Sequence, residues 1–98
     1  MNIKKTKQAG KLIISVAGSL DTSTAPALEA ALNGAFDSVT ELIFDLKELE
    51  YISSAGLRIL LSSMKTMNQR GSMKIINVSR NIMEVFDMTG FSEILTII

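Results

Sequence analysis

The chain has 98 residues, among them 10 basic and 10 acidic side chains, and it contains neither cysteine nor histidine. A chain of this length is expected to form one domain over residues 1–98, and 47% apolar against 20% charged residues is typical of a folded globular protein. The two missing residue types exclude disulfides, thiolate zinc sites, His-ligated metals and imidazole bases, and the balanced charge argues against nucleic acid as the main partner.

The N-terminal residues predict neither export nor membrane insertion. Basic residues occur at Lys4, Lys5 and Lys7, but no apolar segment follows them as it would in a secretory signal. No run in the chain approaches the roughly 18 apolar residues that a membrane-spanning helix needs. We therefore expect a cytoplasmic protein without membrane contact.

Two strands and a helix are predicted for the first part of the chain. Residues 2–7 form a weak strand candidate, Gly10 supplies a turn, and residues 12–16, rich in β-branched side chains, complete a hairpin. A polar loop over residues 18–24 ends in hydroxyl residues before Pro26, which is typical of a helix start. Apolar residues then recur at helical spacing: Leu28, Ala31, Leu32, Ala35 and Phe36.

A buried strand and a second helix are predicted for the middle of the chain. Residues 42–46 form a short apolar run, and residues 47–51 are expected to connect it to the helix. The helix opens at residues 53–56 and ends at Gly71. Its apolar stripe consists of Leu57, Leu60, Leu61, Met64 and Met67.

The last part of the chain predicts strand, helix and strand. Residues 73–78 form the strand, a helix is capped by Ser79 and ended by Gly90, and residues 94–98 are expected to form an edge strand. The complete order is ββαβαβαβ. This alternation predicts an α/β fold, a mixed sheet of about five strands with helices packed against it.

Two polar positions are candidates for function. The serines at residues 53 and 54 follow a strand and start a helix, and in open α/β sheets binding sites occur at this end of the strands. A phosphate there would meet the positive end of the helix dipole and would add about two negative charges. The alternative is that the serine only caps the helix. Asp21, in the loop after the second strand, is expected at the same edge, with a turn or cap residue as its alternative.

The residues predict a binding protein rather than an enzyme. A serine hydroxyl is a poor nucleophile without an activating base, and no general base is visible beside it. The Gly-rich signatures that cradle nucleotide phosphates are also missing, so the sequence gives no support for a cofactor.

Three short segments, in matching order and spacing, carry a family resemblance. Residues 18–21 match a G-x-[LI]-D loop, and residues 51–57 match the box [FY]-[MI]-[DS]-S-[SA]-G-L. Residues 85–91 resemble a helix end of the form F-x-[ML]-[ST]-G-[LF]. Together they resemble the STAS domain of bacterial anti-sigma factor antagonists over nearly the whole chain.

The resemblance implies a phosphorylation switch without catalysis, metal or cofactor. In this family the unphosphorylated antagonist binds an anti-sigma factor, which then releases a sigma factor. The anti-sigma factor is also a serine kinase, and its phosphorylation of the antagonist ends the binding. A serine phosphatase of the PP2C type reverses the modification. The alternative is a partner-switching regulator of another output, such as a phosphatase, a cyclase or a transport process.

The resemblance also implies which residues carry the switch. Gly56 and Leu57 fix the register of the box, so the phosphate is expected on Ser54. Ser53, where many relatives have Asp, is the less favoured acceptor. The residues expected to contact the partner come from the loop and from the helix start: Asp21, Thr22, Ser23, Thr24, Ser53, Gly56, Leu57, Arg58 and Leu61. Neither the sigma factor nor a monomeric or dimeric state is implied.

Overall fold

The computed structural model describes all residues from 1 to 98. It contains five strands and three helices. The elements in chain order are β1 (Asn2–Gln8), β2 (Lys11–Leu20), α1 (Ala25–Leu32), β3 (Glu41–Asp45), β4 (Leu49–Ile52), α2 (Ser54–Met67), β5 (Ser72–Ile76), α3 (Arg80–Thr89) and a 3₁₀ turn, η1 (Phe91–Glu93). The expected α/β fold with a mixed sheet of five strands is confirmed.

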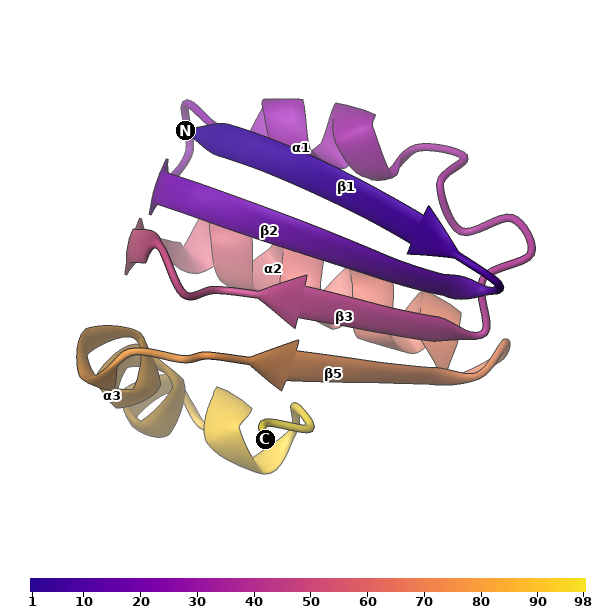
Figure 1. Ribbon diagram of the computed structural model, residues 1–98. Coiled ribbons are helices and arrows are strands. Elements are labelled where there is room, and N and C mark those ends of the chain that lie inside the picture. Colours follow the sequence, from indigo (N-terminus) through magenta and orange to yellow (C-terminus); the bar gives the residue numbers. More distant parts are fainter.

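Strand β2 is the centre of the sheet, because it pairs with three other strands (Figure 1). Strand β1 runs antiparallel to it, as the hairpin prediction required. Residues 11–15 of β2 pair in parallel with β3, and residues 18–20 pair in parallel with β4. Within the pairing with β4 the register shifts between Gly18 and Ser19, and the φ of +93° at Gly18 is readily adopted only by glycine. Strand β5 closes the other edge, parallel to β3.

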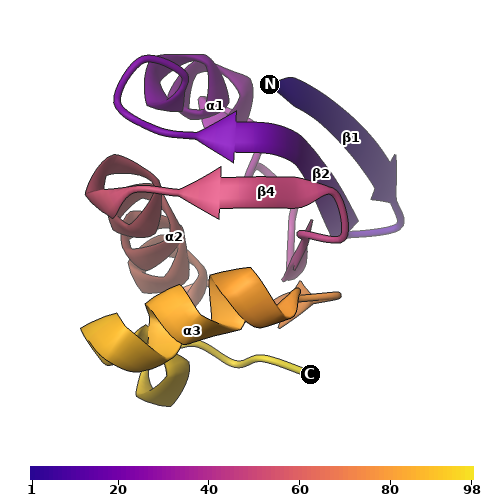
Figure 2. The same cartoon turned by 90° about the vertical axis from the view of Figure 1, so that its left-hand side faces the viewer.

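The hydrophobic core lies between the sheet and helices α1 and α2, which cover the same face (Figures 1 and 2). Side chains alternate along β2, so that Leu12, Ile14 and Val16 are buried in this core. Helix α3 lies beside the sheet and contacts β4, as Figure 2 shows. None of the helices combines the length and the apolar character that crossing a membrane requires.

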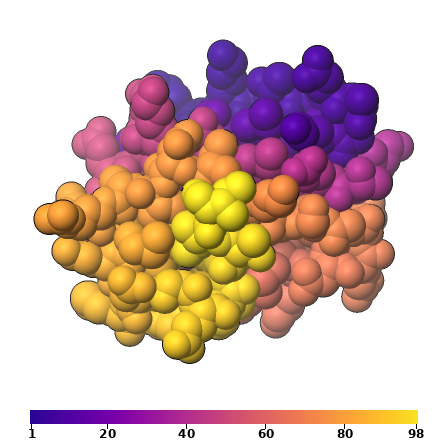
Figure 3. All heavy atoms as spheres, turned by 60° about the horizontal axis from the view of Figure 1, so that its bottom comes forward, coloured from indigo at the N-terminus to yellow at the C-terminus, as the bar shows by residue number.

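The fifth strand is not the expected one. Residues 47–51, expected as a connection, contain most of β4, in which only Leu49 and Ile52 are buried and no alternation is visible. Residues 94–98 form a single bridge, between Ile97 and Ile75 of β5, because the 3₁₀ turn after α3 leaves little chain beside that strand. Figure 3 shows these last residues at the surface beside α3. The observed order is therefore ββαββαβα.

The predicted helices are also corrected in their limits and faces. Helix α1 ends at Leu32, before the last two residues of its predicted stripe, because Asn33 is extended and Gly34 has a φ of +74°. Helix α2 buries Ile59 and Ser63 in addition to part of the predicted stripe, because it packs against both the sheet and α1. Helix α3 has both predicted caps, Ser79 at its start and the left-handed Gly90 at its end.

The loop expected over residues 18–24 is shorter than predicted. Residues 18–20 belong to β2, where Leu20 is buried and pairs with Ile52 of β4. The glycine and serine at the start of this segment suggested a loop, but the register shift accommodates them within the strand. The loop proper therefore starts at Asp21.

Candidate functional site

The carboxyl ends of β2 and β4 bring the two candidate positions together. Leu20 and Ile52 are paired in parallel, so Asp21 and Ser53 leave the sheet at the same edge. The backbone N–H of Ser53 donates to the carbonyl oxygen of Leu20 over 2.9 Å, which ties the two exits to each other. In Figure 2 both strands point the same way and lead into α1 and α2. The edge shared by Asp21 and the serine pair is therefore as expected.

The two adjacent serines have different positions at the start of α2. Ser53 is the N-cap, with extended backbone angles, and its Oγ accepts a hydrogen bond from the backbone N–H of Ala55 at 3.2 Å. Ser54 is the first residue of the helix, its side chain is exposed, and its hydroxyl makes no hydrogen bond within the chain. Capping thus accounts for Ser53 and leaves the hydroxyl of Ser54 free.

The loop before α1 is organised by the carboxylate of Asp21. Its Oδ1 accepts hydrogen bonds from the hydroxyl and the backbone N–H of Ser23, at 2.7 and 2.9 Å, and from the backbone N–H of Thr24 at 3.1 Å. The hydroxyl of Ser23, followed by the N–H of Thr24, holds the pKa of the Asp21 carboxyl below its ordinary value. Asp21 is therefore a turn residue whose carboxylate is ionised at neutral pH and is a weak base. It leaves Thr22 and Ser23 exposed.

Gly56 lets helix α2 approach the ends of the two strands. A Cβ on this buried residue would lie 2.7 Å from Cγ1 of Ile52 and 2.7 Å from Cγ of Leu20, which is closer than side chains pack. Gly56 was expected to contact the partner, but it faces the protein interior. Its effect is to place the serine pair against the edge of the sheet.

A groove of about 340 Å³ opens beside Ser54. Helix α2 lines it with Ser54, Leu57, Arg58 and Leu61, so four of the expected site residues share one hollow. The opposite wall is formed by Thr89 of α3 and Phe91 of the 3₁₀ turn. Neither of these two residues was predicted as part of the site, although both lie in the segment 85–91 that carries part of the resemblance.

The walls of the groove offer apolar surface on which a partner's side chain could pack. Its walls contain two leucines and a phenylalanine, and Arg58 is their only charged residue. No three histidine, cysteine or carboxylate residues gather closely enough to hold a metal ion. The weak base Asp21 is engaged in its own loop.

Comparison with known proteins identifies the family. The model of the STAS domain matches residues 2–98. The anti-sigma-B factor antagonist of Staphylococcus aureus (strain NCTC 8325 / PS 47) is 30% identical over 97 residues, which cover 97% of this chain and 90% of that protein. That of Bacillus subtilis (strain 168) is 29% identical over 98 residues, covering 99% and 90%.

A solved structure agrees in fold. The crystal structure of an anti-sigma factor antagonist from Mycobacterium paratuberculosis matches with a TM-score of 0.88 at 26% identity, over 98% of this chain and 83% of that one. The agreement extends over the sheet, the three helices and the segments that form the groove, because nearly the whole chain is matched. The chain therefore belongs to the STAS domain family.

Proposed function

We propose that this chain is an anti-sigma factor antagonist whose binding is switched off by phosphorylation of Ser54. The observation that carries the proposal is the free, exposed hydroxyl of Ser54 at the wall of the groove, next to a serine that already caps the helix. The names of its relatives support the general role. The unphosphorylated form binds an anti-sigma factor and thereby frees a sigma factor.

The binding surface comprises the loop over residues 21–24 and the groove beside Ser54. Thr22, Ser23 and Arg58 are exposed, and Leu57 and Leu61 supply apolar walls. An apolar side chain of the partner would be buried in the groove, while the loop, held by Asp21, would contact polar groups around it. This arrangement favours a protein partner over a small polar substrate.

The switch acts through charge at this surface. A phosphate on Ser54 adds about two negative charges, and its position in the first turn of α2 is favourable for an anion. At ~8 Å from one partner carboxylate, with an effective dielectric constant of about 20, the repulsion is roughly 4 kcal/mol before screening. That energy corresponds to about a thousandfold loss of affinity, with no refolding required.

The chemistry of the switch belongs to other proteins. The anti-sigma factor would act as the serine kinase, and a PP2C-type phosphatase would remove the phosphate. This chain supplies the hydroxyl only, since the carboxylate at the same edge of the sheet, Asp21, has a lowered pKa and is held by its loop. Ser53 is the less favoured acceptor, because its oxygen is engaged by the N–H of Ala55. We accordingly propose no catalytic activity for residues 1–98.

The test uses Ser54→Ala and Ser54→Asp as immobilised baits in lysate of the source organism. We expect Ser54→Ala to retain a sigma-binding ATPase and Ser54→Asp to bind the purified partner more than tenfold more weakly. Ser53→Asp is the matched control, since it adds the same charge one residue away. If both Ser54 baits retain the same proteins equally, the proposed phosphorylation switch is wrong. If the captured ATPase does not bind a sigma factor, the switch controls a different output.

A further inference from the structure

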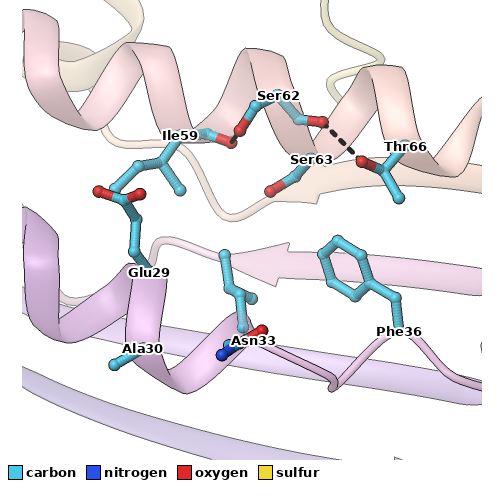
Figure 4. A pocket seen from close by; sticks show the side chains of 9 residues that line it. Glu29, Ala30, Asn33, Phe36, Ile59, Ser62, Ser63 and Thr66 are labelled. Carbon is cyan, nitrogen blue, oxygen red and sulfur yellow. Dashed lines mark hydrogen bonds between the residues drawn. The ribbon is translucent and has the colours of Figure 1, made fainter.

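A second hollow lies on the other flank of α2, between α1 and α2 (Figure 4). Its volume is about 430 Å³, which is within the usual range for sites of small molecules. It shares no residue with the groove beside Ser54. Its walls include Glu29, Asn33 and Phe36 on the side of α1, and Ile59, Ser63 and Thr66 on α2.

Ser63 presents an unpartnered hydroxyl to this hollow. The residue is only 3% exposed, yet its hydroxyl makes no hydrogen bond within the chain, and Figure 4 shows it directed between the two helices. No side-chain oxygen in the structure is both sealed from solvent and without a partner, so this oxygen must open into the hollow. The hydroxyl is thus reached from the hollow and keeps its donor and acceptors available to a partner from outside the chain.

The neighbouring hydroxyls of Ser62 and Thr66 form hydrogen bonds within the helix, whereas that of Ser63 does not. Ser62 donates its proton to the carbonyl oxygen of Ile59 at 3.1 Å, and Thr66 donates to that of Ser62 at 3.1 Å. Both are bonds to the preceding turn, the usual arrangement within a helix. The two hydroxyls therefore present only acceptor lone pairs, whereas Ser63 keeps both its donor and its acceptors free.

The walls of the hollow carry a negative charge and hydrogen-bond acceptors. Glu29 is the only ionisable residue in its walls, and it forms no ion pair. Figure 4 shows its carboxylate at one end of the hollow and the ring of Phe36 at the other. Ile59 and the acceptor hydroxyls of α2 form the wall across from α1. A carboxylate and acceptor oxygens favour an ammonium group and disfavour a phosphate or a carboxylate, and the ring at the far end offers an apolar surface.

The wall on the side of α1 is held in place by two cations. The guanidinium Nη1 of Arg70 donates to the carbonyl oxygen of Phe36 at 2.9 Å, and Nζ of Lys5 donates to that of Ala31 at 3.0 Å. The segment that carries Phe36 is thus attached to the chain just beyond α2. A wall fixed before binding reduces the entropy lost when a ligand is bound.

We propose that this hollow binds a small organic ammonium compound with a short aliphatic chain. The ammonium group pairs with the carboxylate of Glu29, the aliphatic chain lies on Ile59 and toward Phe36, and the hydroxyl of Ser63 forms one hydrogen bond with the ligand. The site is independent of the phosphorylation proposed for Ser54.

The test is a titration of the ¹⁵N-labelled full chain with n-pentylammonium, followed by amide chemical shifts. We expect saturable shifts confined to residues 29–36 and 59–66, with a dissociation constant on the order of millimolar for so small a ligand. Pentanoate and 1-pentanol have the same chain length and should bind at least fivefold more weakly. No saturable shift, shifts elsewhere in the chain, or equal binding of the three compounds would overturn the proposal.

Three variants separate the site from general charge effects. Glu29→Gln should weaken pentylammonium at least fivefold, and Ser63→Ala should weaken it about threefold. Glu84→Gln removes the same charge from the exposed face of α3 and should bind as the wild type does. Since each spectrum also reports whether the variant is folded, an effect of Glu84→Gln as large as that of Glu29→Gln would overturn the assignment.

Discussion

The two flanks of α2 carry hollows of opposite character. The groove toward α3 is lined by leucines and a phenylalanine, with Arg58 as its only charge. The hollow toward α1 is lined by three hydroxyl residues and Asn33 beside four apolar residues, with Glu29 as its only charge. One helix thus separates an apolar, cationic surface suited to a protein from an acceptor-rich, anionic hollow suited to a small cation.

The difference teaches how such sites are encoded. Most of the first groove comes from one segment, in which Ser54, Leu57, Arg58 and Leu61 follow one another at helical spacing. The second hollow requires α1 to lie against α2, which no local pattern specifies. The groove beside Ser54 can therefore be recognised from the sequence, whereas the hollow between α1 and α2 can be recognised only from the folded structure.

Reversing the charge of Arg58 should have the largest effect on the contrast between the flanks. Arg58→Glu changes the groove by two charge units, as a phosphate on Ser54 would, without touching the serine. We expect binding of the anti-sigma factor to weaken about a hundredfold, or roughly 2.7 kcal/mol. Glu29→Lys makes an equal reversal on the other flank and should change this affinity less than twofold, since screening limits its reach to about 10 Å. Isothermal titration calorimetry of both variants measures the contrast, and similar losses would mean that the partner does not distinguish the flanks.

A Cβ at Gly56 should disturb both flanks at once. Gly56→Ala would force α2 away from Leu20 and Ile52, which lie 2.7 Å from the added atom. Overpacking of this kind costs about 1–3 kcal/mol, offset by up to about 1 kcal/mol of helix propensity. We expect a net loss of about 1–2 kcal/mol in the free energy of unfolding, measured by urea denaturation. Wild-type stability would show that the helix can move without cost and that its contact with the strand ends is loose.

The fold was predicted where the pattern is long and regular. The β-branched run of β2, the capped α3 and the hairpin were all visible in the sequence. Strand β4 was not, because four residues with two buried ends carry no periodicity. Residues 94–98 are apolar enough for a strand, but the turn after Gly90 determines how much of them reaches β5.

The candidate site was predicted only in part, for the same reason. The box over residues 51–57 located Ser54, but it could not show which of the two serines caps the helix, since both are good N-cap residues. Thr89 and Phe91 reach the groove through the packing of α3 and the turn that follows it. Gly56 was predicted as a contact, although its value to the site is the absence of a side chain.

Alanine substitutions at Ser53 and Ser54 should differ in their effect on the free energy of unfolding. Ser53→Ala removes the oxygen that accepts from the N–H of Ala55, and loss of an N-cap costs about 1 kcal/mol. Ser54→Ala removes a hydroxyl without a partner and should leave the free energy of unfolding within about 0.5 kcal/mol of the wild type. Urea denaturation of both variants measures the difference. Equal losses would mean that the two hydroxyls share the cap, which would weaken the case for Ser54 as the free acceptor.

Ser63→Ala should have the smallest effect on the free energy of unfolding, and the sign of that effect tests whether the hydroxyl has a partner in the protein. Serine to alanine within a helix gains up to about 0.5 kcal/mol of propensity, and Ser62→Ala gains the same amount one residue away. Ser62→Ala loses a partly buried hydrogen bond to the carbonyl oxygen of Ile59, whereas Ser63→Ala has no bond to lose and removes the polar atom of a buried residue. Ser63→Ala should therefore be at least as stable as Ser62→Ala in urea denaturation. If it is instead less stable by about 1 kcal/mol or more, the hydroxyl has a partner within the protein, and the hollow loses the central polar group on which its specificity depends.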